Sequence, residues 1–254
     1  MKFENTNVYN FENAIRGMRN PLESWKKSDS KITDKFELGE NDKNLAQRLI
    51  AGGSEHRKFL RQIFVCVDIT APLYWWKEFD TYKVGTVANS TSTMHKLATT
   101  PITRDCFEMD DYNADLLVYP REPYDFDQYM DEVADDMIDH CENLRKWYLE
   151  TKDVRYWKEL IRWLPESWLQ TRTVTLNYEN LFSIVHQRKG HKLTEWHSFL
   201  NWVYSLPYAH EFLDVESELT RDATKMRNMM KEIKELGENP TWEDIDTIVE
   251  RYID

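Results

Sequence analysis

The sequence predicts a helix-rich protein of the α+β class. Seven Gly and eight Pro in 254 residues leave long stretches without breakers, while ten Trp, thirteen Tyr and eleven Phe supply large side chains for a core. Two segments, QIFVCVDI (62–69) and TVTLN (173–177), are instead rich in the β-branched and aromatic residues that favour strands. The first segment suits a buried strand as well as a helix, so the pattern leaves its state open.

The N-terminal part divides into an arm and a short helix. Residues 1–44 are polar and weakly periodic, which predicts an N-terminal arm over the domain surface. Apolar residues between Leu45 and Ile50 predict a short helix, and Gly52 and Gly53 would end it. Pro72 then permits a new helix to begin.

The stretch YWWKEFDTYK (74–83) mixes aromatic rings with both signs of charge. On a helix, Trp75 and Phe79 share one face, while Trp76 and Asp80 share the neighbouring one. A stripe of rings at helical spacing is usually a core face, with the ions solvating the other side. The alternative is that the rings stack against a flat ligand.

Polar and helical segments follow. The run Asn89–Thr93 crowds short polar side chains together and predicts a loop or a cap rich in hydrogen-bonding groups. The amphipathic pattern of 126–156 predicts one long helix or two close ones, and two more helices are expected within 163–207. The charged segment 211–254 predicts a C-terminal helical pair interrupted between Gly237 and Pro240.

Charge and composition limit the classes of function. The formal net charge of −12 disfavours nonspecific binding to nucleic acid or to an anionic membrane. No apolar run reaches the roughly 18 residues of a membrane helix. The N-terminus MKFENTNVYN does not resemble a secretory signal, so we expect a cytoplasmic protein. Three widely spaced cysteines predict reduced thiols and no disulfide framework.

Several motifs of catalysis and metal binding are absent from the sequence. There is no GxGxxG, GxSxG or HExxH and no Gly-rich phosphate loop. The pairs His186 with His191 and Glu55 with His56 lack the i, i+4 spacing that puts two ligands on one helical face. We therefore expect no metal site.

A series of motifs carries a resemblance to a known family. TLNYENLFSIVHQR (175–188), followed by His191 and Glu195, resembles the C-terminal motif of the flavin-dependent thymidylate synthases, the ThyX family. Glu55–His56 resembles the glutamate–histidine signature that this family has before a strand. The resemblance implies a ThyX-like domain at 45–210, with a mixed sheet flanked by long helices and a C-terminal helical extension at 211–254. It also implies a homotetramer whose active sites lie between subunits.

The same resemblance implies a set of site residues. Arg188 matches the arginine that grips the pyrimidine nucleotide and Ser92 matches the active-site serine, so these two are the expected catalytic residues. The expected flavin contacts are Glu55, His56, Trp75, Trp76, Asn89 and Asn177. The expected nucleotide contacts are Lys83, Ser90, His95, Lys96 and His191. Apart from the resemblance, an arginine ending a helix and a serine or asparagine beginning one are ordinary capping residues, and both interpretations remain open.

One motif departs from the family. Where the family has an Arg-His-Arg signature, this chain offers Glu78, Phe79 and Asp80, which removes positive charge that holds phosphates. One hypothesis is a divergent enzyme that binds FAD or a pyrimidine nucleotide and transfers a hydride or a one-carbon unit. It would need methylenetetrahydrofolate and NADPH only if the family chemistry is retained. The alternative is a non-catalytic binding or regulatory protein on the same scaffold.

Overall fold

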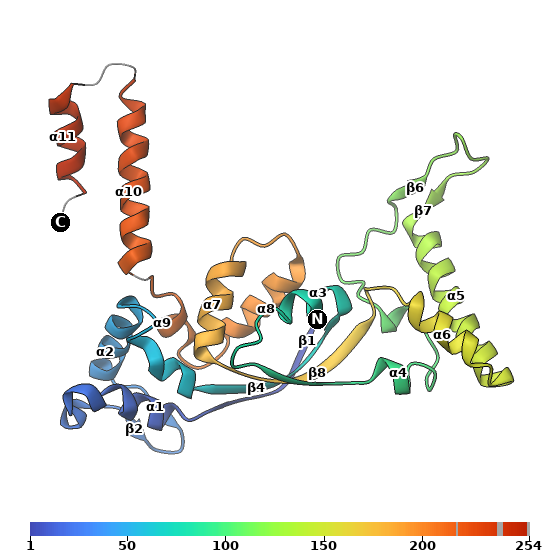
Figure 1. Ribbon diagram of the computed structural model, residues 1–254, viewed down its shortest axis with the longest axis horizontal. Helices are drawn as coiled ribbons and strands as arrows, with labels where there is room; N and C mark the ends of the chain where they lie inside the picture. Colours follow the sequence, from blue (N-terminus) through green and yellow to red (C-terminus); the bar gives the residue numbers. More distant parts are fainter. Residues whose placement is uncertain (217, 238–240, 253–254) are drawn as a thin grey trace. The chain divides into compact units, whose positions relative to one another are not determined.

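The computed structural model describes residues 1–216, 218–237 and 241–252, and it confirms the α+β class (Figure 1). The chain divides into two compact units. Unit 1 comprises Met1–Tyr9 and Phe64–Pro207, and unit 2 comprises Asn10–Ile63 and Tyr208–Asp254. These boundaries differ from the expected arm, domain and extension because the first residues of the chain form a strand of the unit 1 sheet.

Unit 1 is built on a four-stranded sheet with the strand order β1-β4-β8-β5. Its strands are β1 (Lys2–Tyr9), β4 (Phe64–Pro72), β8 (Leu169–Asn177) and β5 (Val87–Ser90). Every neighbouring pair is antiparallel, so the expected mixture of strand directions is not found. The segment whose state the sequence left open therefore lies mainly in a central strand, and TVTLN ends the strand beside it.

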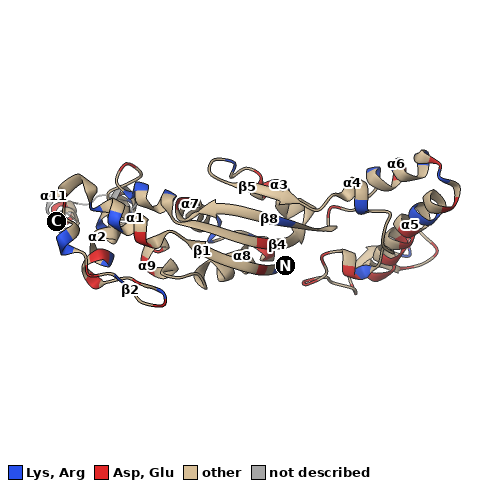
Figure 2. Cartoon of the chain, turned by 90° about the horizontal axis from the view of Figure 1, so that it is seen from below, with Lys and Arg blue, Asp and Glu red and all other residues tan. Residues whose placement is uncertain are grey.

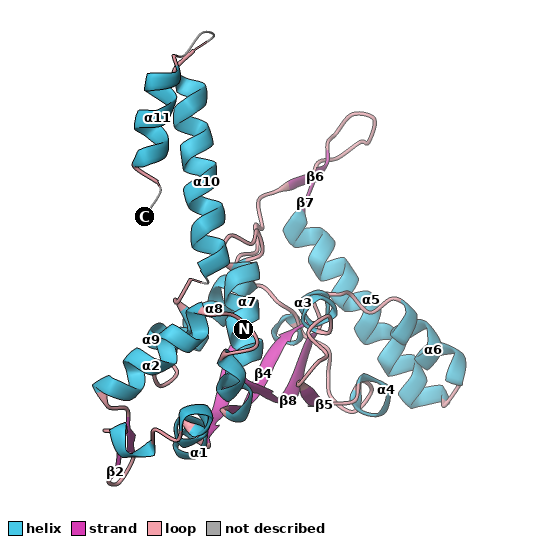
Figure 3. Ribbon diagram, turned by 60° about the vertical axis from the view of Figure 1, so that its left-hand side comes forward, coloured by secondary structure: helices cyan, strands magenta, loops and turns pink. Residues whose placement is uncertain are grey.

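Helices cover one face of this sheet. Val65, Val67 and Ile69 of β4 are fully buried, whereas Asp68 between them is only partly covered. This alternation is typical of an antiparallel sheet with one open face. Figures 1 and 3 show α3 (Leu73–Phe79), α7 (Tyr178–Arg188) and α8 (Thr194–Tyr204) on the same side of the strands. Two helices were expected within 163–207, and α7 and α8 confirm them.

Aromatic rings from α3 and α8 form the centre of the unit 1 core. The Trp75 ring centroid lies 4.9 Å from that of Trp76 and 5.1 Å from that of Phe79 on α3. It also lies 5.0 Å from Trp196 and 5.6 Å from Phe199 on α8. Since burying one large apolar side chain contributes about 1.5–3 kcal/mol, these five rings stabilise the contact between the two helices strongly.

The remainder of unit 1 has a second small core. Its elements are α4 (Thr93–Lys96), the 3₁₀ helix η4 (Arg104–Cys106), β6 (Leu117–Tyr119), β7 (Gln128–Tyr129), α5 (Met130–Thr151) and α6 (Val154–Arg162). The expected helical region 126–156 is thus two close helices. Ile138 and Cys141 of α5 pack with Leu160 of α6 in this core. Acidic residues run along α5 (Figure 2), and Arg104 binds two of its aspartates at 2.7 and 2.8 Å.

Unit 2 is a small helical unit with a two-stranded hairpin. Its helices are α1 (Phe11–Met18), α2 (Glu40–Ala51), α9 (Ala209–Leu213), α10 (Glu218–Glu235) and α11 (Trp242–Glu250). The hairpin is β2 (Lys31–Ile32) with β3 (Phe36–Glu37), and the 3₁₀ helices are η1 (Asn20–Leu22), η2 (Trp25–Lys27) and η3 (Arg57–Gln62). Its core includes Phe11, which stacks on Phe36 and meets Tyr208 edge-on.

Residues 10–44 therefore form structured elements and not a surface arm. The helix expected at 45–50 begins earlier, at Glu40, because the carboxylate of Asp29 accepts hydrogen bonds from the free backbone N–H groups of Asn41 and Asp42. The C-terminal helical pair is present as α10 and α11. The expected interruption at 237–240 lies mostly outside the described residues. In the described part of the chain, no helix combines the length and the apolar character that crossing a membrane requires.

Candidate functional site

The last turn of α3 places an acid among the cationic and aromatic residues of α7 and α8. The carboxylate of Glu78 accepts hydrogen bonds from Nη1 of Arg188 at 2.8 Å and from Nε1 of Trp196 at 2.9 Å. Nε2 of His191 lies 3.3 Å from the same oxygen. We call these residues, together with Tyr82, the Glu78 cluster.

Arg188 is held on three sides in this cluster. Its Nε donates to the Tyr82 hydroxyl at 2.9 Å, and its guanidinium carbon lies 4.5 Å from the Trp196 ring centroid. The side chain is 18% exposed. A planar cation that is stacked on a ring and paired with a carboxylate loses much of its attraction for an additional anion.

His191 completes the cluster from the loop before α8. Its Nδ1 accepts a hydrogen bond from the backbone N–H of Leu193 at 3.2 Å. The other ring nitrogen, Nε2, faces the Glu78 carboxylate.

A second acid–arginine pair involves Asp80, the residue that follows α3. Nη1 of Arg172 on β8 donates to Asp80 at 2.8 Å, and its Nε donates to Gln170 Oε1 at 2.9 Å. The guanidinium carbon lies 4.2 Å from the Trp76 ring centroid. Thus both acids at the end of α3 are bound to arginines, Glu78 to Arg188 and Asp80 to Arg172.

A pocket of about 320 Å³ opens beside the second pair. It is lined by Phe79, Asp80, Tyr82, Lys83, Thr86, Ala88 and Arg172, and we call it the Arg172 pocket. The Thr86 hydroxyl in its wall is buried and has no hydrogen-bond partner among the described residues. The volume lies at the lower end of the approximately 300–1,000 Å³ of small-molecule sites. Because Tyr82 belongs both to this pocket and to the Glu78 cluster, the two features are adjacent.

Two expected flavin contacts are core residues. Trp75 and Trp76 are each fully buried within the aromatic core, and the indole N–H of Trp76 donates to the Gln170 carbonyl at 2.9 Å. Neither ring presents a face to a ligand, so the structure does not support the stacking role and favours the core interpretation. The face of Trp76 is instead taken by Arg172.

The other residues expected near α4, β5 and α7 are mostly engaged locally. Ser92 caps α4, where its hydroxyl accepts from the His95 backbone N–H and lies 2.9 Å from Nδ1 of the same histidine. Asn177 caps α7 through reciprocal hydrogen bonds with Asn180. Two residues expected to contact ligands, Asn89 and Ser90, are exposed on the edge strand β5, and Lys83 and Lys96 are exposed as well. Of this group only Lys83 lines the Arg172 pocket.

The expected flavin set is divided between the two units. Glu55 and His56 belong to unit 2, where they line a pocket of about 480 Å³. Asn89 and Asn177 belong to unit 1. Trp75 and Trp76 are buried, and the Asn177 side chain is used in the cap of α7.

Some residues of the site were given no role from the sequence. Gln170, Arg172 and Thr86 are the main ones. The alternation of side chains along β8 could have indicated that Arg172 is covered. Val174 and Leu176 lie on the same face of the strand as Arg172, and both are buried under the helices. A charged residue on a covered strand face needs a partner, and Asp80 supplies it.

The motif acid Glu195 lies elsewhere in unit 1. It is buried and accepts a hydrogen bond from the Tyr74 hydroxyl. Burial and this carboxylate raise the pKa of Tyr74 above its usual value. Among residues 1–216, 218–237 and 241–252, no three His, Cys, Asp or Glu side chains are grouped so that they could hold a metal ion.

Comparison of the fold with known proteins gives a consistent result. Flavin-dependent thymidylate synthase ThyX from Helicobacter pylori, in complex with FAD and dUMP, aligns with a TM-score of 0.61 and 17% identity over 85% of this chain and 100% of that chain. The chain has the fold of the flavin-dependent thymidylate synthases. A second ThyX structure from H. pylori, also with FAD and dUMP, has a TM-score of 0.60 and 18% identity over 84% and 97%.

A methylase of known structure also has a fold similar to that of this chain. The UMP/dUMP methylase PolB from Streptomyces cacaoi, bound with 5-Br dUMP, has a TM-score of 0.57 and 12% identity over 86% of this chain and 96% of that chain. No protein-family model matches the sequence, and no curated protein matches it. The expected fold is therefore confirmed by structure alone.

Proposed function

We propose that this chain binds a pyrimidine nucleoside or nucleotide in the Arg172 pocket, on a scaffold that no longer uses free arginines to hold a phosphate. The observation that carries the proposal is the pairing of both arginines of the site with acids from the end of α3, at 2.8 Å in each case. The ThyX and PolB structures of the same fold hold dUMP or a dUMP analogue, which supports a ligand of the pyrimidine class.

The groups in the pocket suit the polar edge of a pyrimidine better than a phosphate dianion. Asp80 offers carboxylate oxygens that can accept an N–H from the base, while Arg172 and Lys83 offer donors to carbonyl oxygens. The buried Thr86 hydroxyl gains a partner when a ligand enters. The carboxylate of Asp80 would repel a phosphate placed beside it.

The ThyX structures of the same fold also hold FAD, but the proposal for this chain is limited to binding of the pyrimidine ligand. One observation favours binding without catalysis. Glu78 already satisfies Arg188 and faces His191, so the cluster is neutralised internally and offers no free cation to polarise a substrate.

Isothermal titration of the purified protein with deoxyuridine and with dUMP tests the proposal. We expect deoxyuridine to bind at least as tightly as dUMP. Arg172→Gln should weaken deoxyuridine binding by about tenfold, equivalent to about 1.4 kcal/mol, while the matched surface variant Arg162→Gln on α6 should not. The absence of saturable binding by any pyrimidine ligand to the folded protein would reject the proposal.

A second variant separates a changed ligand from a lost site. Glu78→Gln removes the charge that neutralises Arg188 while preserving the side-chain shape. We expect it to raise the affinity for dUMP relative to deoxyuridine by about tenfold, since a nearby cation then becomes available to the phosphate. An unchanged ratio of the two affinities would favour the interpretation that Arg188 serves only the structure.

A further inference from the structure

We propose that unit 2 contains a second binding site, for a small flat monocarboxylate, in a pocket beside Arg19. The pocket has a volume of about 320 Å³, and its walls include Glu12, Arg16, Arg19, Trp25, Ile32 and Phe36. We call it the Arg19 pocket. It belongs to unit 2, whereas the Arg172 pocket belongs to unit 1, so this site does not depend on the function proposed above.

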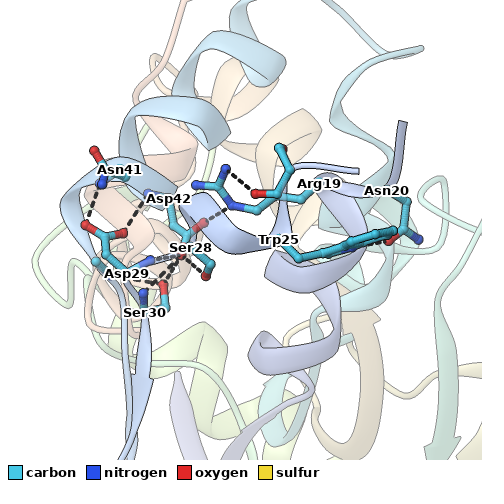
Figure 4. Close-up of polar contacts among 10 residues, drawn as sticks. Arg19, Asn20, Trp25, Ser28, Asp29, Ser30, Asn41 and Asp42 are labelled. Atoms are coloured by element: carbon cyan, nitrogen blue, oxygen red, sulfur yellow. Dashed lines mark hydrogen bonds and ion pairs between the residues drawn. The ribbon is translucent and has the colours of Figure 1, made fainter. Parts of the chain in front are cut away.

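Arg19 of the pocket wall forms a buried ion pair with Asp42 (Figure 4). Arg19 is only 4% exposed, and its Nε donates to Asp42, which is completely buried, at 2.5 Å. The carboxylate also accepts hydrogen bonds from the hydroxyls of Ser28 and Ser30, each at 2.6 Å. These contacts fix the guanidinium in place before any ligand arrives.

The Nη2 group of this guanidinium is open to a ligand. Nη1 of Arg19 reaches the Ser24 carbonyl at 3.4 Å, and Nη2 has no hydrogen bond among the described residues. Arg19 lines the pocket, and the proposal places its Nη2 donor toward the ligand. A nearly buried cation with unused N–H groups is a preformed contact for a carboxylate oxygen.

The other charges of the pocket favour a single negative charge. Arg16 lines the wall one turn earlier on α1, and its hydrogen bond to the Asn13 side chain is long at 3.4 Å. Glu12 lines the pocket as well. A monoanion can contact both arginines, while a dianion meets more repulsion from Glu12 and from Asp42 behind Arg19.

Rings held in fixed positions give the site its shape. The indole N–H of Trp25 donates to the Asn20 side chain at 2.9 Å, which orients a ring that is 46% exposed. Phe36 is stacked on Phe11, with ring centroids 5.6 Å apart and planes 7° from parallel. Apolar walls beside a guanidinium edge suit a planar body that ends in a planar carboxylate.

The site can be tested on the full chain with 4-fluorobenzoate, followed by the broadening of its ¹⁹F NMR line as protein is added. We expect saturable binding of 4-fluorobenzoate that added benzoate reverses. Added 4-fluorobenzyl alcohol, the uncharged analogue, should not displace it. Arg16→Gln and Arg19→Lys should each raise the dissociation constant at least about tenfold. The matched control Arg61→Lys, at an exposed position of unit 2, should leave it unchanged.

Three results would overturn the proposal. The first is the absence of saturable broadening with the wild-type protein. The second is wild-type affinity in Arg16→Gln, a surface change that decides the question even if Arg19→Lys fails to fold by circular dichroism. The third is displacement of 4-fluorobenzoate by inorganic phosphate as effectively as by benzoate, which would identify a general anion site and not a carboxylate site.

Discussion

Replacing Asp42 with alanine should destabilise unit 2 more than any single surface change. The carboxylate is completely buried and accepts hydrogen bonds from Arg19, from the hydroxyls of Ser28 and Ser30, and from the Ser30 backbone N–H at 3.1 Å. Its removal leaves a guanidinium that is 4% exposed without its counter-ion. The turn of the chain between Arg19 and α2 would lose its common acceptor.

The size of the effect follows from this burial. Removing one partner of a buried ion pair costs about 3–5 kcal/mol, because the remaining charge stays desolvated. The cost comes from the unpaired arginine more than from the lost attraction. Consequently Arg19→Met combined with Asp42→Leu should recover a large part of the stability lost in Asp42→Ala, since an apolar pair replaces the ions.

Urea unfolding followed by far-ultraviolet circular dichroism measures this difference as a lower midpoint with an unchanged slope. Glu12→Gln is the matched control, because Glu12 is an exposed acid in the same unit and should change stability by less than about 0.5 kcal/mol. A loss below about 1 kcal/mol for Asp42→Ala would refute the reasoning. So would a double variant that is no more stable than the single one.

The pH dependence provides a second check on the same residue. Burial alone would raise the pKa of Asp42, but hydrogen bonds from Ser28, Ser30 and Arg19 outweigh it and hold the pKa below its ordinary value of 3.8. A carboxyl group with a lowered folded-state pKa contributes stability that is fully present above that ordinary value. The contribution is lost as pH falls through the lower folded-state pKa. The difference between wild type and Asp42→Ala should therefore be constant near neutral pH and shrink only in strong acid.

Other expectations follow from the structure. Asn177→Ala should cost about 1 kcal/mol in urea unfolding because it removes the cap of α7, and a cost near zero would contradict the capping role. Burial raises the pKa of the Cys141 thiol to about 11, so a thiol-specific reagent at pH 8 should label it only after unfolding, and rapid native labelling would contradict its burial. Hydrogen bonds from Arg145, opposed by burial and assisted by the Ile102 N–H, lower the pKa of Glu142 to about 2. Glu142→Gln should thus cost about 1.5–3 kcal/mol at pH 7 and progressively less as pH falls below 4.5 toward 2, whereas a loss independent of pH would exclude a charge effect.

Sequence periodicity correctly predicted several buried residues and secondary-structure elements. The spacing of Trp75 and Phe79 predicted a shared core face, and both rings are buried on α3. The β-branched segments at 62–69 and 173–177 contribute to two neighbouring strands. The helices within 163–207 were also predicted, because apolar residues repeat there at helical spacing.

The candidate site was less predictable because its residues meet only across strands and helices. Arg188 was recognised from a motif, but nothing local indicates that Glu78 and Trp196 bind it. No role was predicted for Arg172, since its partner Asp80 lies 92 positions earlier in the chain. Trp76 was expected to meet a ligand, yet its ring faces Arg172 in the interior.

The sequence by itself determined the α+β class, the main helices and the two acids, Glu78 and Asp80, at the end of α3. These follow from local properties, namely side-chain shape, periodic polarity and formal charge, which each segment carries wherever it lies. Only the tertiary structure decided that these two acids pair with Arg188 and Arg172, and that Arg19 and Asp42 form a buried pair. The free energy of a charge depends on which groups surround it after folding, and that environment is assembled from residues far apart in the chain.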